Sequence, residues 1–297
     1  MISKVEVWSP IIRAVRTSYR WVRKRGIIVV PMALLFVFVI TAAIPYVLMP
    51  HTHSEVALSN QLIPPFWEQG GSSEYPLGTD QLGRDIFSRL ILGARYSLMV
   101  AFAALFLGGI VGLILGMISG YNGGWMDRVL MRLVDSTLAF PLILLAMVLI
   151  VALKPSILTV IIAVAAVYWA RFARVVRGET LSIKERDYVI LARVAGASPF
   201  RIMLFHIFPN VINTWVVLLT LIVGQVIIIT ATLSFLGAGI PPPAPAWGNM
   251  LAEGRGYITS AWWLSFWPGL AITLVVLSFN LFGDWLRDAL DPRLRQV

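Results

Sequence analysis

The sequence predicts an all-α membrane protein with six transmembrane helices. Of its 297 residues, 58% are hydrophobic and only 13% are charged, about half of the roughly 25% that is usual in soluble domains. The mean hydropathy is +0.82. A soluble core has no room for so many apolar side chains, so lipid must solvate a large part of the chain.

Long stretches with little or no charge give the expected spans. A helix needs about 20 apolar residues to cross the hydrocarbon core of a bilayer. The candidate segments are 27–48, a part of 96–126, 133–153, 155–170, 211–236 and 262–283. The third contains Asp135. The fourth is short, but Lys154 and Arg171 bracket it, and their long side chains can carry the charges to the interfaces.

The distribution of positive charge predicts the orientation. Nineteen of the 24 Lys and Arg residues fall on one side of the six expected spans, and the positive-inside rule places that side in the cytoplasm. Both termini, 1–26 and 284–297, then lie inside, whereas the loops 50–95 and 237–260 lie outside. A cleaved signal peptide is the alternative for 27–48. Its apolar run exceeds the usual length of about 7–15 residues, and no clean cleavage site follows.

The outer loop 50–95 is too short for a domain with its own core. From Leu77 to Leu98, apolar residues recur at helical spacing, and a Gly-Thr-Asp turn ending at Asp80 suggests a helix cap. We expect an amphipathic helix at the outer membrane surface that leads into the second span, with a solvated loop as the alternative. His51 and His53 form an H-x-H pair, which is either a metal site or part of an ordinary polar loop.

The second outer loop, 237–260, is rich in proline and tryptophan. Four prolines between Pro241 and Pro245 forbid a helix and favour a stiff extended turn. The tryptophans are expected to anchor the outer face of the membrane, or alternatively to line a substrate path. These residues are Trp247, Trp262, Trp263 and Trp267.

The cytoplasmic segment 177–210 has the most informative pattern. It predicts a helix from about Lys184 to Val194, then a break, and then a second short helix that stops near Pro209. A basic segment of this length and shape exceeds what a connection needs. We therefore expect the turn to contact a partner protein, with a purely structural loop as the alternative. The expected contact residues are Arg193, Ala195, Gly196, Ala197, Ser198, Pro199, Phe200 and Arg201.

No enzymatic motif is present. The sequence has no P-loop, no G-x-S-x-G and no H-E-x-x-H, and the absence of cysteine excludes thiolate sites and disulfides. We expect no catalytic residue, metal or cofactor in this chain. The net charge of +9 is explained by membrane orientation, so we expect no nucleic-acid partner.

One group of charges lies close to a predicted span. Arg128, Arg132 and Asp135 share a helix face, and Arg132 can pair with Asp135. An interface pair is the favoured interpretation over an intramembrane functional site. We find no acid at the expected mid-plane, which argues against proton-coupled secondary transport.

The segment 190–209 resembles the cytoplasmic loop of permeases from binding-protein-dependent ABC importers. That loop reads E-A-A, three residues, Gly, nine residues and I-x-L-P. Here Ile190-Leu191-Ala192 opens the segment, Gly196 stands in place, and His206-Ile207-Phe208-Pro209 closes it. Ile190 departs from the usual Glu, and His206 from the usual Ile.

Five further stretches are similar to the second permease of dipeptide, oligopeptide and nickel importers. They are LGTDQLGRDIFSRLILGAR, MRLVDSTLAFP, YVILARVAGA, LSFLGAGIPPPAPAWGNML and FNLFGDWLRDALDPR. The similarity extends from about Leu77 to Arg293. Ala246 stands where these subunits often carry an acid before Trp-Gly, so this chain lacks that acid.

The resemblance implies a type I importer fold with five core helices within 96–283 plus the first span, in the bacterial inner membrane. It implies a homologous second permease, two ATPase subunits that bind ATP and Mg, and a periplasmic or lipid-anchored substrate-binding protein. The turn around Gly196 would be the coupling helix seated on an ATPase. A self-sufficient channel or secondary transporter is the alternative function. The substrate class stays open among peptides, nickel chelates and glutathione.

Overall fold

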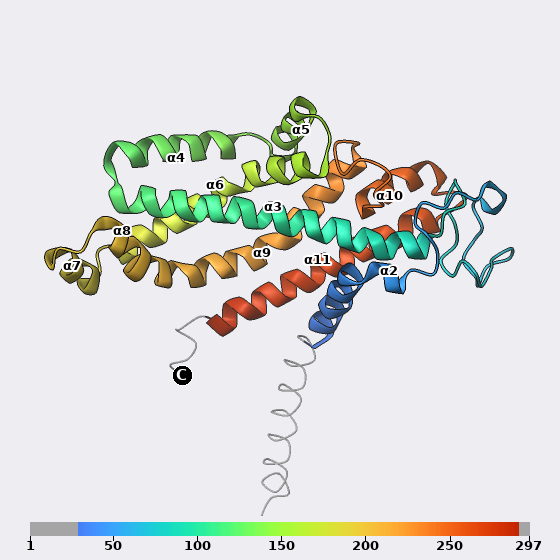
Figure 1. The fold of residues 1–297 in the computed structure, drawn as a ribbon, viewed down its shortest axis with the longest axis horizontal. Coiled ribbons are helices and arrows are strands. Elements are labelled where there is room, and N and C mark those ends of the chain that lie inside the picture. The colour runs from blue at the N-terminus through green and yellow to red at the C-terminus, as the bar shows by residue number, and fades with distance from the viewer. Residues whose placement is uncertain (1–28, 291–297) are drawn as a thin grey trace, which may run out of the picture.

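The computed structural model describes residues 29–290, and Figure 1 shows them as an elongated helical bundle. The predicted segment 1–26, the first two residues of the first predicted span and the tail 291–297 lie outside the described residues. The elements are the helix Val29–Ala43, α2 Pro45–Leu48, η1 Leu58–Asn60, α3 Ile86–Asn122, α4 Gly124–Ala139, α5 Leu142–Leu153, α6 Ile157–Ile183, α7 Asp187–Val194, α8 Pro199–Ile202, the π-helical turn η2 Met203–Ile207, α9 Phe208–Phe235, α10 Trp247–Gly254, η3 Arg255–Tyr257 and α11 Trp263–Leu290.

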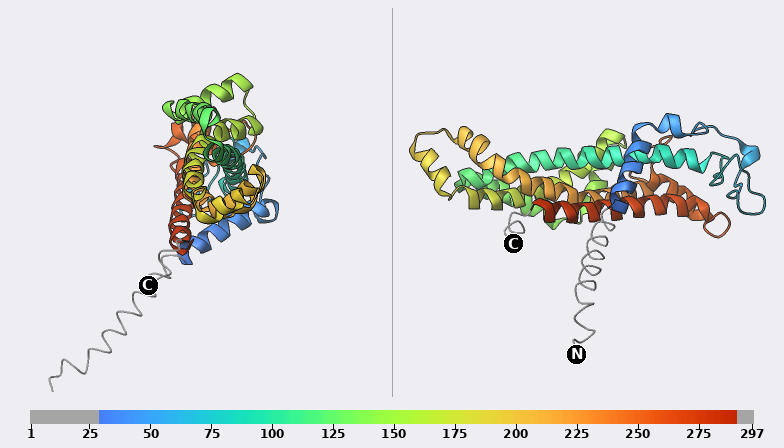
Figure 2. Two further views of the ribbon diagram at one scale, coloured as in Figure 1. Left: turned by 90° about the vertical axis from the view of Figure 1, so that its left-hand side faces the viewer. Right: turned by 90° about the horizontal axis from the view of Figure 1, so that it is seen from below.

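The long helices α3, α6, α9 and α11 run along the long axis of the bundle (Figures 1 and 2). Helices α7 and α8 lie at one end, and α10 lies with the loop 49–85 at the other end (Figure 1). Four helices, counting α8 to α9 as one, are long and apolar enough to cross a membrane, and the bent pair α4–α5 makes a fifth. The helix Val29–Ala43 is shorter and begins where the described residues begin, so the count of six and the position of the termini stay predictions.

Helix α3 is one continuous helix of 37 residues, about 55 Å long at 1.5 Å per residue. The helix predicted within 77–98 therefore begins only at Ile86 and leads directly into the second predicted span, whereas 77–85 is not helical. The predicted cap at Asp80 is wrong. Asp85 caps the helix, since its carboxylate accepts hydrogen bonds from the backbone N–H groups of Phe87 and Ser88.

The predicted third span 133–153 is not one helix. Helix α4 ends at Ala139, α5 begins at Leu142, and their axes differ by 97°. The break follows from Pro141, because a proline disfavours helical geometry in the residue before it. Phe140 accordingly has an extended backbone, with φ −80° and ψ 142°.

Helix α6 continues well beyond Ala170, where the fourth span was predicted to end. It ends at Ile183, so Arg171, Arg174 and Arg177 are helical residues and not loop residues. The predicted limit at Ala170 is wrong because charge does not end this helix: all three arginines have partners on neighbouring helices.

Helix α9 is also longer than predicted, because no break occurs at Pro209. The chain is helical from Pro199 to Phe235, with the π-helical turn η2 just before the proline. A proline inside an α-helix clashes with the carbonyl four residues earlier and donates no hydrogen bond. The wider turn accommodates Pro209 and keeps the turn at α8 mechanically joined to α9.

Four glycines spaced four residues apart bring α3 against α6. They are Gly108, Gly112, Gly116 and Gly120. A Cβ atom at Gly112 would lie 2.4 Å from the carbonyl oxygen of Trp169, and one at Gly116 would lie 2.7 Å from that of Ala173. Small residues at this spacing let helix backbones approach closely in membranes, and this interface forms the centre of the bundle.

Candidate functional site

The turn between α7 and α8 is built by three local signals. Gly196 has φ +81°, a conformation that glycine adopts without steric cost. The N–H of Ala197 donates to the carbonyl of Ala192 over 3.0 Å, and the N–H of Gly196 donates to that of Arg193 over 3.0 Å, which is a Schellman motif. Ser198 then caps α8, and Pro199 occupies its first turn. The predicted break at Gly196 to Pro199 is confirmed.

Large apolar side chains are exposed around this turn. The exposed fractions are 66% for Leu191, 81% for Val194 and 70% for Phe200. The turn lies at the end of the bundle (Figure 1), beyond the apolar part of α9. These three side chains are therefore available for contact with another molecule.

The predicted contact residues lie together in this turn. All of them are exposed, except that Ala197 is half-buried. The guanidinium of Arg193 lies 5.8 Å from the ring centre of Tyr121, so a cation–π contact links α7 to the end of α3. Arg201 places a positive charge in the last turn of α8.

The predicted charge cluster on α4 forms differently. Asp135 is paired with Arg174 on α6, and no ion pair within residues 29–290 joins Asp135 to Arg132. The Nε of Arg128 donates to the carbonyl of Gly124 on its own helix over 3.4 Å. The predicted Arg132–Asp135 pair is wrong, because α4 packs along α6 and the arginines of α6 reach its acids.

A second pair between α4 and α6 was not predicted. Arg177 donates from Nε and Nη2 to the two carboxylate oxygens of Asp127, over 2.5 and 2.7 Å. Ser119 on α3 donates to the same carboxylate. Such bidentate pairs are among the stronger polar contacts in proteins, and this one joins three helices near the end that carries α7.

The opposite end carries a buried network of two acids and two arginines. Arg84 and Arg89 each donate to Asp80 and to Glu253 on α10. The side chains of Asp80 and Arg89 are only 1% and 3% exposed. Because buried charges are costly unless they are paired, the network fixes α10 against the start of α3.

The two histidines of the loop 49–85 lie beside this network. The ring of His51 stacks on Tyr75 at 5.0 Å. Burial lowers the pKa of His53, and the charges of Arg89 and Arg84 add to that effect. Within residues 29–290, no group of three or more His, Asp or Glu side chains is arranged to hold a metal ion.

Two of the four predicted membrane anchors are core residues. Trp247 and Trp263 are only 1% and 4% exposed, and their indole N–H groups donate over 3.0 Å to the carbonyls of Leu90 and Thr79. Their predicted role at the membrane surface is therefore wrong. The docking of α10, which was not predicted, buries Trp247.

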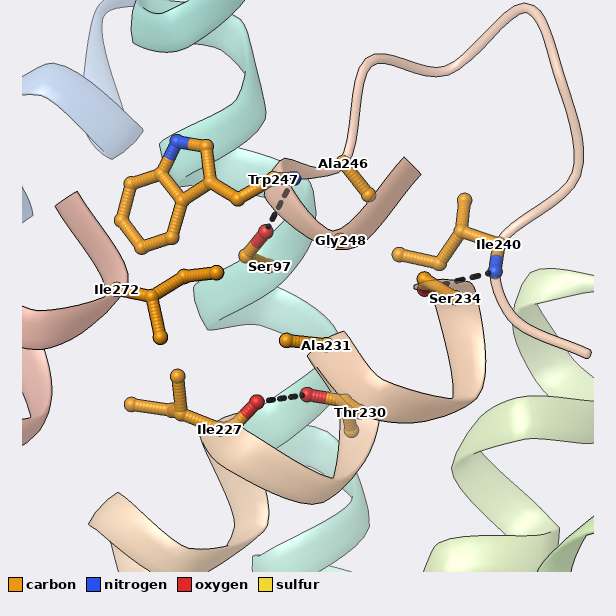
Figure 3. A pocket seen from close by; sticks show the side chains of 10 residues that line it. All are labelled: Ser97, Ile227, Thr230, Ala231, Ser234, Ile240, Ala246, Trp247, Gly248 and Ile272. Carbon is orange, nitrogen blue, oxygen red and sulfur yellow. Dashed lines mark hydrogen bonds between the residues drawn. The ribbon is translucent and has the colours of Figure 1, made fainter. Parts of the chain in front are cut away.

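Figure 3 shows the small cavity where α3, α9 and α10 meet. The backbone N–H of Trp247 donates to Oγ of Ser97 over 3.2 Å, and that of Ile240 donates to Oγ of Ser234 over 3.4 Å. The cavity measures about 10 Å³, room for a single water. Ala246, which stands in place of the family's frequent acid, is buried in its wall.

Comparison with known proteins agrees with this architecture. Residues 112–296 match the family described as "Binding-protein-dependent transport system inner membrane component". The dipeptide transport system permease protein DppC of Haemophilus influenzae is 42% identical over 274 residues, which cover 92% of each chain. The glutathione transport system permease protein GsiD of Pectobacterium atrosepticum is 41% identical, over 96% of this chain and 95% of that protein.

A solved structure has the same fold. It shows inward-facing conformations of the MetNI methionine ABC transporter, and a chain in it superposes with a TM-score of 0.56 at 20% identity, covering 68% of this chain and 96% of that chain. The fold is therefore that of a type I ABC importer permease. On the strength of the family match and of these relatives, the chain belongs to the inner-membrane components of binding-protein-dependent transport systems.

Proposed function

We propose that this chain forms half of the translocation pore of an ATP-driven peptide importer, and that the turn 195–201 couples it to an ATPase subunit. The observation that carries the proposal is the exposed apolar and basic surface of the turn, with Val194, Phe200 and Arg201 at its edges. Interfaces of this kind depend on a few anchors in pockets of the partner. Phe200 is the largest exposed anchor in the turn.

The continuous helix from Pro199 to Phe235 supports the coupling. A rigid helix transmits a displacement at one end to the whole of its length. When ATP closes the ATPase pair, the two turns of a permease pair are drawn together and the two α9 helices tilt. The pore then changes from inward-facing to outward-facing.

The partners in this proposal are a homologous second permease, two ATP-binding cassette subunits and an external substrate-binding protein, either periplasmic or lipid-anchored. ATP and Mg are bound by the ATPase subunits. The relatives with 42% and 41% identity are named as dipeptide and glutathione permeases. Both kinds of substrate are short peptides with a free carboxylate, and we assign this chemical class to the chain.

Reconstitution tests this function against a self-sufficient channel or secondary transporter. Liposomes that contain this chain alone should take up no dipeptide, with or without ATP. Liposomes with both permeases, the ATPase subunits and the binding protein should take up dipeptide with ATP and not with a non-hydrolysable analogue. Uptake by the chain alone, driven by an ion or solute gradient, would contradict the proposal.

A further inference from the structure

Helix α6 carries three arginines about one turn apart, and one of them differs from the others. Arg174 and Arg177 are each paired with a carboxylate of α4. Arg171 instead donates from Nη1 to the amide oxygen of Gln225 on α9 over 2.7 Å. Its guanidinium also lies 5.3 Å from the ring centre of Tyr168, but within residues 29–290 no carboxylate lies within ion-pair distance of Arg171, so no acid of the described part neutralises its charge.

This contact lies deep within the spanning helices. Arg171 is 14 residues from the start of α6, and Gln225 is 10 residues from the end of α9, so they lie about 21 and 15 Å from those helix ends. Arg171 is partly exposed. A guanidinium facing hydrocarbon is strongly unfavourable, and intramembrane charges face water or a partner.

Helix α9 has two different exposed faces. Thr214, Gln225 and Thr232 follow one another at spacings of 11 and 7 residues, so they share one side of the helix. A hollow of about 190 Å³ lies on this side, lined by Ile228, Ala231, Thr232, Phe235, Leu251 and Ile272. The lining of this hollow is apolar except for Thr232 and includes neither Arg171 nor Gln225. The polar character of this face comes from Thr214, Gln225 and Thr232, and from Arg171, which contacts Gln225.

The other face of α9 is apolar. Together with α3 and α11 it forms a groove of about 230 Å³ whose lining includes Phe102, Phe106, Val216, Leu219, Val223 and Phe279. Such a surface suits lipid or another apolar helix. The contrast between the two faces indicates that water, and hence a polar solute, is on the side of Gln225.

We infer that this polar face of α6 and α9 lines the substrate path and that Arg171 receives the C-terminal carboxylate of a peptide in transit. The inference rests on the proposed function. A guanidinium matches a carboxylate in geometry as well as charge. Gln225 orients Arg171 without neutralising it and leaves its other N–H groups for the substrate. Every peptide with a free C-terminus has this carboxylate, so Arg171 can bind peptides whatever their side chains are.

The discriminating experiment compares a free peptide with its amide. The probes are Ala-Ala and Ala-Ala-amide, and the protein is the complete reconstituted importer. Arg171→Gln should lower the uptake rate of Ala-Ala about tenfold, as expected for loss of one charge-assisted contact, and leave that of Ala-Ala-amide unchanged. Arg171→Lys should retain the preference for the free peptide. Arg174→Gln, one turn away, is the matched control and should not change the ratio of the two rates.

The outcomes separate this inference from the proposed function. A wild-type importer that takes up neither probe contradicts both. A wild-type importer that takes up Ala-Ala, with an unchanged ratio of rates in Arg171→Gln, contradicts the role of Arg171 alone. Equal loss of both probes also contradicts it, because that is the result of a purely structural tie between α6 and α9.

Cysteine labelling tests the position of the path independently. Ile228 on the polar face and Ile110 on α3 are 47% and 39% exposed, and the chain has no cysteine. In the assembled importer, Ile228→Cys should react with a membrane-impermeant thiol reagent, as read from the mass of this chain, and Ile110→Cys should not. Labelling of Ile110→Cys alone, or equal labelling of both, would overturn the assignment of the path.

Discussion

Because α3 and α6 are in close contact, we expect Gly112→Ala to lower the stability of the protein. The new Cβ atom would lie 2.4 Å from both Cβ of Phe172 and the carbonyl oxygen of Trp169, more than 1 Å inside the usual separation of about 3.5–4.0 Å. Because backbone atoms form part of the contact, the two helices must shift apart. Overpacking of this kind costs about 1–3 kcal/mol, and the better helix propensity of alanine offsets up to about 1 kcal/mol.

The net destabilisation then lies between about 0 and 3 kcal/mol, and Gly178→Ala is its matched control. Gly178 lies inside α6, and a Cβ atom there meets no atom of the described part of the chain within 4 Å, so alanine should stabilise the helix slightly. Thermal unfolding of the detergent-purified protein should give a lower apparent Tm for Gly112→Ala than for wild type, by a few degrees. A Gly112→Ala protein that melts at or above Gly178→Ala would refute the packing argument.

Three further predictions concern topology and charge. A cysteine at Ser182, which is exposed at the end of α6, should resist impermeant reagents in intact cells, and its labelling there would reverse the orientation. Asp127→Asn removes the charge that holds Arg177 and should cost about 1–2 kcal/mol in thermal unfolding; an unchanged apparent Tm would contradict this. Asp80→Asn leaves the buried Arg89 with weaker partners and should cost about 3 kcal/mol or more, so it should lower the apparent Tm further than Asp127→Asn does.

The cores of the long helices were predictable from the sequence, because length and apolar composition decide which segments cross lipid. The segments 211–236 and 262–283 coincide with the apolar parts of α9 and α11, although the helix that contains α9 begins at Pro199 and α11 continues to Leu290. Local backbone signals were equally readable, as the turn at Gly196 illustrates. The glycines on α3 also carry a readable signal, since small residues at every fourth position indicate close helix packing in membranes.

What could not be predicted depends on contacts between distant segments. Arg177 and Asp127 are 50 residues apart, and only the packing of α4 on α6 brings them together. Trp247 is of a residue type that is typical of membrane-surface anchors. It is nevertheless buried, because α10 docks on α3 and α9. The sharp bend at Pro141 illustrates an intermediate case, since the proline predicts a break but not the 97° change of direction.

Gly196→Asp tests most directly whether the turn at Gly196 couples uptake to ATP hydrolysis. No atom of residues 29–290 lies within 4 Å of a Cβ at Gly196, so we expect any steric or electrostatic effect of the aspartate beyond local backbone strain to come from a partner. Gly237 has a similar φ of +82° and an equally open position, which makes Gly237→Asp a control for that strain.

The measurement is peptide-stimulated ATP hydrolysis and peptide uptake in the same preparation of the assembled importer. Gly196→Asp should lower both rates together while the chain stays inserted, because an acidic side chain does not fit a closely packed interface. Phe200→Ala should do the same more mildly, and Gly237→Asp should leave both rates near wild type. A Gly196→Asp importer that assembles and transports at the wild-type rate would show that this turn is not the coupling element.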